Sequence, residues 1–478
     1  MMKGWLIFYA FALLVTSGRA QSRGLIDSLC TAYNRMDVLN GVVLVADKGS
    51  VIYNKAFGKA NFEWDINNTT DTRFKIASIS KPFTAVIILQ LCQEGKIKLD
   101  GKVNDYITGY PNGDKITILQ LLTHTSGIID TRDIKGFDET FGMQHLTHSQ
   151  LIDVFKDSAL VFMPGSKFYY SSFNYNLLAF IIEKITGKNF KDVLKERIFS
   201  VAGMAHTATL EDNAVNNRYA YGYERNYSDI KPAHYFDASG TVGSGSIVTT
   251  AGDLVLFFTA LKTNKLLNET FTKMFFTPQG VDDNNVKTGF TSWYYSLHLN
   301  GNDSTGVAYY AGGHFGVNAL VYDCYEKNKM VIILLNVKTP RMFEVADNVL
   351  NILYSQKFEW PKDAYVRLLA KDIKEYGVNN AVQKFKARKI KYGDAYTFKP
   401  RDLNRLGYYF ISDNDAATAV EIFKLNLQYF PNEGDFYDSL GEGYVLLGDK
   451  KNAAINLKKA IELNPSNRHA KELLNSIQ

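Results

Sequence analysis

A serine hydroxyl lies three residues before a lysine amine, at the start of an apolar segment. The two residues are Ser78 and Lys81, and the apolar run from Pro82 to Leu91 follows at once. Serine becomes a nucleophile near neutral pH only when a nearby base accepts its proton, and residues three apart on a helix share one face. A helix N-terminus adds partial positive charge and free N–H groups. The spacing therefore predicts a lysine-activated serine suited to acyl transfer.

The pair has a plain alternative, because serine and lysine three residues apart occur by chance in most chains of this length. That alternative is a capped, solvated helix start. In favour of chemistry, residues 74–77 are expected to form a short extended segment, and the helix after the pair consists almost entirely of core residues. A polar step in front of a buried helix favours a functional role.

The composition indicates a globular protein of more than one domain. The 478 residues, 46% of them hydrophobic, are enough for two or three domains with their own cores. The 54 Lys and Arg against 49 Asp and Glu give a net charge of +5, which does not indicate a nucleic-acid partner. The eight histidines form no His-Glu-x-x-His pattern, and no Walker or Gly-x-Gly-x-x-Gly loop joins a strand to a helix. We expect no metal ion and no other cofactor.

Residues 1–20 are typical of a secretory signal peptide. Lys3 precedes an apolar run from Trp5 to Val15, and Gly18 and Ala20 are small residues at the positions that signal peptidase reads. The run is too short to span a bilayer comfortably, so an uncleaved anchor is the weaker alternative. We expect a secreted protein, periplasmic or extracellular, with no stable membrane span after cleavage. The three cysteines lie far apart, so no disulfide scaffold is expected.

Two β-hairpins are expected in the first part of the chain. One joins Gly41–Ala46 to Val51–Phe57, and the other joins Ala319–Tyr322 to Met330–Leu335. Between them, Ile118–Leu122 is expected to be helical. Strands at both ends of the region, with helices between them, predict an α+β domain.

Three further segments resemble motifs of one enzyme family. They are Thr123-His124-Thr125-Ser126-Gly127, Tyr170-Ser171-Ser172 within the stretch that begins at Pro164, and the glycine-rich stretch Tyr310–Gly316. Together with the Ser78 step and the first hairpin, they resemble the serine β-lactamase family of class C β-lactamases, DD-peptidases and esterases. The resemblance implies an antiparallel sheet flanked by helices and a serine hydrolase activity.

The resemblance also implies roles for individual residues. Ser78 would be the nucleophile, and Lys81 and Tyr170 would share the general-base work. A tyrosine with an ordinary pKa of about 10 can act as a base near neutral pH only beside positive charge, or by relaying a proton through lysine. Lys81 would be that neighbour. His124 is left out of the catalytic set, because a lone histidine is more often a hydrogen-bonded packing residue.

The third motif can be aligned in two registers. In the preferred register, Tyr310–Gly312 occupies the place of the family's Lys-Thr-Gly strand, and the Gly313 N–H joins that of Ser78 as the oxyanion hole. The alternative uses His314–Gly316; in the preferred register His314 is a cleft-edge or turn residue. The candidate oxyanion and substrate-binding residues are Gly313, Tyr310, Gly312, Ser172 and His314.

Two of these positions depart from the family pattern. Ser172 stands where relatives usually have asparagine, and Tyr310 replaces a cationic or ionisable residue. Both departures weaken the case for β-lactam hydrolysis more than the case for acyl transfer. The expected substrate is a small molecule or a cell-wall peptide or ester that offers an ester, β-lactam or peptide-like amide. Two alternatives stay open: a penicillin-recognising carrier that deacylates slowly, and a catalytically idle scaffold.

A repeat with a period of 34 residues occupies the C-terminal part of the chain. Its recurring positions are Leu406-Gly407, Ala419 and Pro431, then Leu440-Gly441, Ala453 and Pro465. This is the period of a tetratricopeptide helix pair, and it predicts an all-α domain with a concave groove for a protein or peptide partner. Packing of the repeat against the catalytic domain is an equal alternative.

These patterns predict four regions. They are a signal peptide over residues 1–20, a hydrolase domain over 24–355, a helical linker over 356–400 and a tetratricopeptide domain over 401–478. The basic residues of the linker are interpreted as a solvated face.

Overall fold

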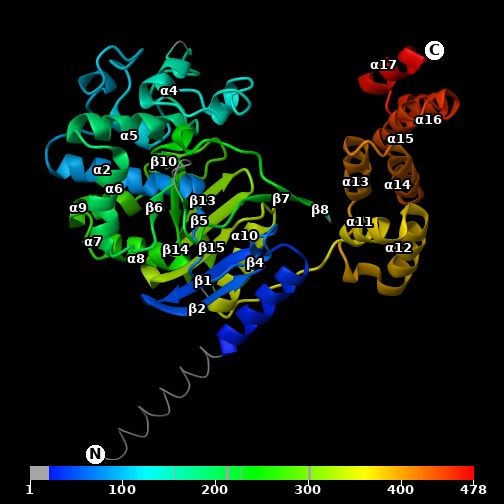
Figure 1. Cartoon of the computed structure of the whole chain (residues 1–478), viewed down its shortest axis with the longest axis horizontal. Coiled ribbons are helices and arrows are strands. Elements are labelled where there is room, and N and C mark those ends of the chain that lie inside the picture. The colour runs from blue at the N-terminus through cyan, green and yellow to red at the C-terminus, as the bar shows by residue number, and fades with distance from the viewer. Residues whose placement is uncertain (1–20, 157, 211–214, 228, 300–302, 478) are drawn as a thin grey trace, which may run out of the picture. The chain divides into compact units, whose positions relative to one another are not determined.

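The computed structural model describes residues 21–156, 158–210, 215–227, 229–299 and 303–477, and the chain divides into two compact units (Figure 1). The first unit holds Met1–Glu224 and Lys231–Trp360, and the second holds Arg225–Ile230 and Pro361–Gln478. The predicted signal peptide lies outside the described residues. Within the described ranges, no helix has the length and apolar character that a membrane span requires.

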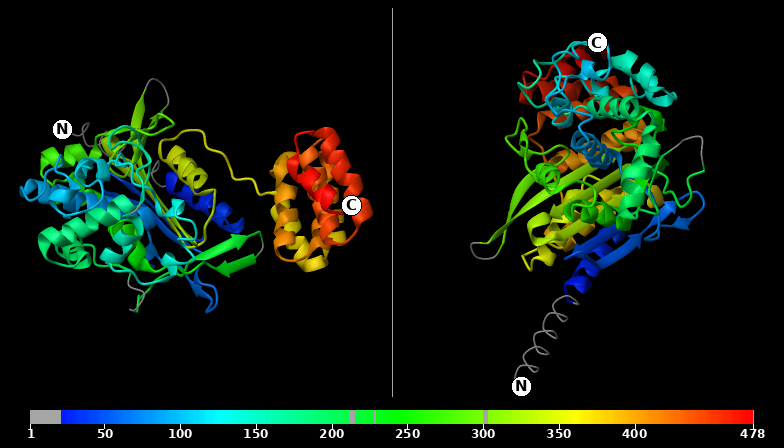
Figure 2. Two further views of the ribbon diagram at one scale, coloured as in Figure 1. Left: turned by 90° about the horizontal axis from the view of Figure 1, so that it is seen from above. Right: turned by 90° about the vertical axis from the view of Figure 1, so that its left-hand side faces the viewer.

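An eight-stranded antiparallel sheet forms the centre of the first unit (Figure 2). Its strand order is β10-β11-β12-β13-β14-β15-β1-β2. Both predicted hairpins are confirmed, because β1 (Gly41–Asp47) pairs with β2 (Ser50–Phe57) and β14 (Val317–Cys324) pairs with β15 (Lys329–Leu335). β1 also pairs with β15, so the two hairpins meet inside the sheet. The other strands are β10 (Gly280–Val281), β11 (Lys287–Thr288), β12 (Trp293–His298) and β13 (Ser304–His314).

The turn between β1 and β2 fixes their register. Lys48 and Gly49 have φ angles of 52° and 77°, and Asp47 pairs with Ser50 across them. Two consecutive residues in the left-handed region are what a type I′ turn requires, and the twist of that turn matches the twist of the strands. The local sequence therefore favours this hairpin, and the Lys48 N–H also donates a hydrogen bond of 2.7 Å to the Asn328 carbonyl in the neighbouring turn.

Helices cover both faces of the sheet, which is why β1 is apolar at almost every position. Val42 and Leu44 pack into a core with helices that include α2 and α8, whereas Val43 and Val45 pack against the helix over residues 21–35 and α10. A strand buried on both faces cannot alternate apolar and polar residues. The predicted fold, an antiparallel sheet flanked by helices, is confirmed. The main helices are α2 (Lys81–Gln93), α5 (Phe173–Thr186), α8 (Ala251–Lys262) and α10 (Met342–Leu353).

Shorter elements connect these layers. The helices are η1 (Ala77–Ser80), η2 (Val103–Asp105), α3 (Ile118–Leu122), η3 (Thr131–Asp133), η4 (Phe141–Met143), α4 (His148–Phe155), α6 (Phe190–Leu194), η5 (Lys195–Phe199), α7 (Ser200–Ala202), η6 (Ala238–Thr241), α9 (Glu269–Phe276) and η7 (Tyr325–Lys327). The short strands are β3 (Lys59–Asn61), β4 (Ile66–Asn67), β5 (Phe74–Lys75), β6 (Ala208–Thr209), β7 (Tyr223–Asn226), β8 (Asp229–Pro232) and β9 (Ile247–Thr249).

Helical hairpins make up the second unit. Gly407 and Gly441, 34 residues apart, let paired helices approach: an added Cβ would lie 2.2 Å from the Phe423 ring and 2.7 Å from the Leu457 side chain. Both glycines therefore allow close helix packing in successive hairpins. The tetratricopeptide assignment stays a prediction from sequence. The helices are α11 (Tyr365–Tyr376), α12 (Val378–Tyr392), η8 (Gly393–Ala395), α13 (Pro400–Ser412), α14 (Ala416–Tyr429), α15 (Gly434–Leu446), α16 (Lys450–Leu463) and α17 (Arg468–Ile477).

The segment predicted as a linker is a folded part of the second unit. Its helices α11 and α12 bury Leu369 and Phe385 in one core with Leu406 and Ile422 of α13 and α14. Basic residues occur along the sequence of α12, so the apolar positions that face this core form no clear pattern in the sequence. The division between the units falls at Trp360, ahead of these helices.

Candidate active site

Ser78 lies in a short 3₁₀ turn between a strand and a helix of the first unit. Strand β5 leads into the 3₁₀ helix η1, which holds Ser78, and α2 begins at Lys81. Side chains three apart are eclipsed in a 3₁₀ turn, so Ser78 and Lys81 lie on one face. Ala77, directly before the serine, has a φ of 45°, a left-handed conformation that is uncommon for a residue with a Cβ. Ser78 is partly exposed, whereas Lys81 is 1% exposed.

The structure brings Ser78, Lys81 and Tyr170 together. Lys81 Nζ lies 3.0 Å from Ser78 Oγ, and the Tyr170 hydroxyl lies 2.8 Å from the same oxygen. Lys81 Nζ is also 4.9 Å from the centre of the Tyr170 ring. A nucleophile with two groups in hydrogen-bond reach that can move protons is the arrangement that covalent catalysis needs.

Backbone and side-chain oxygens hold the Lys81 amine in place. Lys81 Nζ donates a hydrogen bond of 3.0 Å to the carbonyl of Ser244, and Ser172 Oγ lies 3.5 Å away. The same stretch of chain accepts a hydrogen bond from Thr84, through the Gly243 carbonyl at 2.6 Å. The loop before β9 therefore fixes α2 and the amine together.

Strand β13 lies directly against the turn that carries Ser78. A Cβ added at Gly312 would lie 2.1 Å from the Ile76 carbonyl oxygen and 3.2 Å from the Ser78 nitrogen. Real Cβ contacts are essentially never shorter than 3.0 Å, so only glycine allows this approach. At Gly313, which is exposed, the nearest atom to such a Cβ is Asn318 Nδ2 at 3.7 Å.

Tyr310 and His314, with which the two registers of the third motif begin, both pack against aromatic side chains. Tyr310 is 1% exposed and its ring centre lies 4.9 Å from that of Phe258; burial raises the pKa of its hydroxyl well above 10. Tyr310 is therefore a core residue, so its side chain supplies no charge to a substrate. His314 packs edge to face against Phe236 and Phe315, with burial lowering its pKa to about 2. It is neutral at neutral pH.

A buried carboxylate supports the tyrosine segment. Asp130, 2% exposed, accepts a hydrogen bond of 2.8 Å from the Ser172 N–H through Oδ2. Burial opposes ionisation of Asp130, but the hydrogen bonds from the Ser172 backbone and Thr131, together with the charge of Arg132, outweigh it and lower the pKa. The ionised Asp130 thus anchors the backbone that presents Tyr170 and Ser172.

His124 packs against the ring of Tyr170. The two ring centres are 4.4 Å apart with an interplanar angle of 27°, and His124 is 2% exposed. Burial, followed by the nearby charge of Lys81, lowers the pKa of His124 to about 3. Its Nδ1 accepts a hydrogen bond of 3.2 Å from the Ser171 N–H, which places the proton of the neutral ring on Nε2. The residue is thus a neutral support for Tyr170.

The low pKa of His124 predicts a loss of stability in acid. Since its pKa is about 3 in the folded chain and about 6.5 in the unfolded chain, the folded state resists protonation. The stabilisation is complete above pH 6.5 and is lost as the pH falls toward 3, at about 1.4 kcal/mol per pH unit. At pH 5 the first unit should be about 2 kcal/mol less stable from this group alone. Urea unfolding at pH 5, 6 and 7 measures the change.

The control for this prediction is His124→Phe, which keeps an aromatic ring against Tyr170 but cannot titrate. Between pH 6.5 and 5, the free energy of unfolding of this variant should fall less steeply than that of the parent protein. The difference in slope corresponds to one proton fewer taken up per molecule on unfolding. Equal slopes in the variant and the parent would contradict the buried, neutral state of His124.

Several residues around the site give no signal in the sequence. The Asp130 carboxylate contacts a backbone N–H and the Ser244 contact is a backbone carbonyl, and no motif records either interaction. Trp293, the first residue of β12, stacks with Tyr170 at a ring-centre distance of 6.0 Å, and the Arg132 guanidinium lies 6.0 Å from the Tyr170 ring centre. Both come from segments distant in sequence from Ser78.

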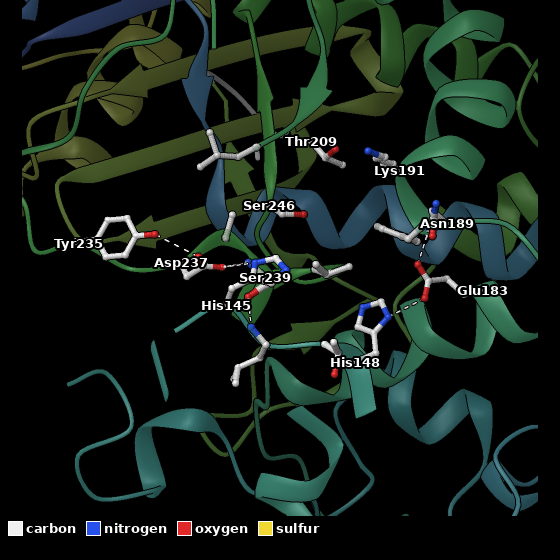
Figure 3. A pocket seen from close by; sticks show the side chains of 16 residues that line it. His145, His148, Glu183, Asn189, Lys191, Thr209, Tyr235, Asp237, Ser239 and Ser246 are labelled. Atoms are coloured by element: carbon white, nitrogen blue, oxygen red, sulfur yellow. Dashed lines mark hydrogen bonds and ion pairs between the residues drawn. The ribbon is translucent and has the colours of Figure 1, made fainter. Parts of the chain in front are cut away.

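A pocket of about 810 Å³ lies away from these residues (Figure 3). Two histidine–carboxylate contacts border it: His148 Nδ1 to Glu183 at 2.7 Å, and His145 Nδ1 to Asp237 at 3.4 Å. Neither Ser78 nor Lys81 nor Tyr170 lines it. The candidate site is therefore defined by the cluster of the Ser78 hydroxyl, the Lys81 amine and the Tyr170 phenol, and this pocket is separate from it. Among the described residues, no group of three or more His, Cys, Asp or Glu side chains could hold a metal ion.

Comparisons with known proteins identify the family of the first unit. Residues 28–356 match the family described as Beta-lactamase. The chain is 33% identical over 239 residues to a putative penicillin-binding protein, PbpX, of Bacillus subtilis, covering 50% of this chain and 59% of that protein. It is 27% identical over 310 residues to a teichoic acid D-alanine hydrolase of Staphylococcus aureus, covering 64% of this chain and 72% of that protein.

A solved structure extends the likeness to the fold. The penicillin binding protein from Bacillus halodurans is 27% identical, with a TM-score of 0.60 over 68% of this chain and 98% of that one. The family match covers most of the first unit. The chain therefore belongs to the beta-lactamase family of serine hydrolases.

Proposed function

We propose that the protein is a secreted hydrolase that forms an acyl-enzyme at Ser78 and releases the acyl group to water. The observation that carries this proposal is the position of Ser78 Oγ, 3.0 Å from Lys81 Nζ and 2.8 Å from the Tyr170 hydroxyl. Three groups that can hold or pass a proton thus meet at Ser78. Of the Ser78–Lys81 pair, Ser78 is partly exposed and Lys81 is buried.

In the acylation step, Ser78 Oγ attacks the carbonyl carbon of the substrate. Its proton passes to Tyr170, directly or through Lys81, and the bond to the leaving group breaks as Tyr170 delivers a proton to that group. The Ser244 carbonyl accepts a hydrogen bond of 3.0 Å from the Lys81 amine, which holds the amine beside Ser78. Deacylation runs the same steps with water in place of Ser78.

The backbone N–H groups of Ser78 and Gly313 are the proposed oxyanion donors. The approach of Gly312 to the Ser78 nitrogen supports this arrangement, because Gly313 is the next residue along β13. Preorganised N–H groups stabilise the negative charge that develops on the carbonyl oxygen.

The proposed substrate is an ester or peptide-like amide, with a D-alanyl ester of a cell-wall polymer as the leading case. The teichoic acid D-alanine hydrolase among the relatives supports this choice. The burial of Tyr310 also supports it, since β13 offers no cationic side chain at this position to a β-lactam carboxylate. Secretion rests on the signal-like residues 1–20, and a protein partner for the helical unit rests on its 34-residue repeat.

Four acyl donors test the proposal: a fluorescent penicillin, a chromogenic cephalosporin, a short-chain nitrophenyl ester and a D-alanyl ester. Each is mixed with the parent protein, Ser78→Ala and Tyr170→Phe, and turnover and intact mass are recorded. We expect the ester donors to be turned over by the parent protein, slowly by Tyr170→Phe and not by Ser78→Ala.

The intact mass separates the remaining hypotheses. An added acyl mass that disappears with time supports the hydrolase, whereas a stable penicillin adduct without turnover supports the slow carrier. If the parent protein shows neither adduct nor turnover with any of the four donors, the acyl-enzyme proposal fails and the idle scaffold is favoured.

A further inference from the structure

Two side chains that the proposed chemistry does not use lie beside the ring of Tyr170. The Arg132 guanidinium carbon is 6.0 Å from the ring centre, and the side chain of Arg132 is 71% exposed. Trp293 stacks with the same ring at 6.0 Å and 29°, and continues to Tyr309 at 5.8 Å and 20°. A cation and an aromatic surface thus adjoin the ring whose hydroxyl contacts Ser78.

These residues lie on the side of the leaving group, which is a deduction that rests on the proposed function. When Ser78 Oγ bonds to the acyl carbon, the departing oxygen or nitrogen must receive a proton. Tyr170, 2.8 Å from Ser78 Oγ, is the group placed to give it. The leaving group therefore departs toward Tyr170, and the side chains around that ring border it.

The local charges leave Arg132 able to bind an anion. Its carboxylate neighbour Asp130 is 2% exposed and accepts hydrogen bonds from the Ser172 and Arg132 N–H groups and the Thr131 hydroxyl. Arg132 Nε lies 3.5 Å from Asp130 Oδ1, a long contact that orients the guanidinium. Its planar fork of N–H donors matches carboxylate and phosphate oxygens.

Strand β13 carries no lysine or arginine, which favours Arg132 as the cation for an anionic substrate group. Tyr310, at the position where relatives carry an ionisable side chain, is buried against Phe258. An anionic substrate group must therefore find its partner elsewhere around Ser78. Arg132 is an exposed cation in contact with the ring of a proposed catalytic residue.

We propose that Arg132 and Trp293 form a leaving-group subsite, and that the natural substrate is an acyl ester or amide whose leaving group carries a carboxylate or a phosphate. Trp293 receives the apolar or sugar-like face of that group, and Arg132 binds its oxyanion. In the reaction, the carbonyl carbon gains a bond to Ser78 Oγ and loses its bond to the leaving oxygen, which takes the proton from Tyr170.

Matched acetyl esters test the subsite. The leaving groups are 3-hydroxybenzoate, 3-hydroxyphenyl phosphate, and the neutral methyl 3-hydroxybenzoate. The ratio of kcat/KM for each anionic ester to that for the neutral ester is measured in the parent protein, Arg132→Gln, Arg132→Lys and Arg218→Gln. Arg218 is a control of the same charge, 63% exposed and paired with Asp71 at 3.6 Å.

We expect Arg132→Gln to lower this ratio about tenfold, Arg132→Lys to restore part of it, and Arg218→Gln to leave it unchanged. Trp293→Ala should raise KM for all three esters without changing the ratio. The larger loss, with the carboxylate or with the phosphate, shows which oxyanion the site prefers. An unchanged ratio in Arg132→Gln overturns the inference.

A binding measurement keeps this inference separate from the proposed chemistry. Calorimetry of 3-hydroxybenzoate and of phenyl phosphate with Ser78→Ala, which needs no turnover, should show binding that the double variant Ser78→Ala, Arg132→Gln loses about tenfold. Equal affinities in both proteins contradict the subsite, even if the esters are hydrolysed. Weakened binding supports it, even if no ester is hydrolysed and the acyl-enzyme proposal fails.

Discussion

Replacing Lys81 with methionine should reduce kcat/KM for a short-chain nitrophenyl ester by about 1,000-fold or more, while the chain stays folded. The amine lies 3.0 Å from Ser78 Oγ, and removing a positioned acid–base group typically costs 10² to 10⁴ in rate. Methionine has nearly the same volume and no charge to desolvate, so the 1% exposed site can accept it. We expect the free energy of unfolding to change by no more than about 1 kcal/mol, measured by urea denaturation.

Lys262→Met is the matched comparison. Lys262 forms an ion pair with Asp323, which is completely buried, so the variant leaves a carboxyl group without its cation. This change should lower the free energy of unfolding by about 3 kcal/mol or more, because an uncompensated buried charge is costly. One buried lysine would thus serve activity and the other stability. Full activity in Lys81→Met would show that Tyr170 alone can activate Ser78.

Gly312→Ala should lower the rate of ester hydrolysis by at least about 100-fold. The added Cβ would lie 2.1 Å from the Ile76 carbonyl oxygen, so β13 or η1 must move. Either movement separates the Ser78 and Gly313 N–H groups, and a misplacement of about 1 Å costs about that factor. The melting temperature should also fall, since crowding a packed core costs about 1–3 kcal/mol. Steady-state kinetics and thermal unfolding measure the two effects.

Gly313→Ala is the control for this prediction. It replaces the neighbouring glycine without the steric clash that Gly312→Ala causes. Its Cβ would meet nothing closer than Asn318 Nδ2 at 3.7 Å, and its N–H remains. The melting temperature of this variant should match that of the parent protein. If Gly312→Ala instead retains full activity, β13 does not lie against Ser78 as described.

Local patterns were sufficient for much of the fold. The apolar run of β1 and the turn at Lys48 and Gly49 indicate a hairpin, because the strand pattern and the turn geometry can both be recognised in consecutive residues. The Ser78 step is equally local, since a 3₁₀ turn aligns residues three apart. The linker boundaries over residues 356–400 stay a prediction, whereas the apolar face of α12 becomes visible only against α13 and α14.

The sequence by itself determined which residues are candidates for the nucleophile, its lysine and, through the family motifs, the tyrosine, because each belongs to a short segment with its own pattern. Only the tertiary structure decided what surrounds them. It buried Tyr310, set the Ser244 carbonyl on the Lys81 amine, and placed Arg132 and Trp293 beside Tyr170. Every residue type has a backbone carbonyl, so its role leaves no trace in the sequence, and contacts between segments that are distant in the sequence depend on how the whole chain packs.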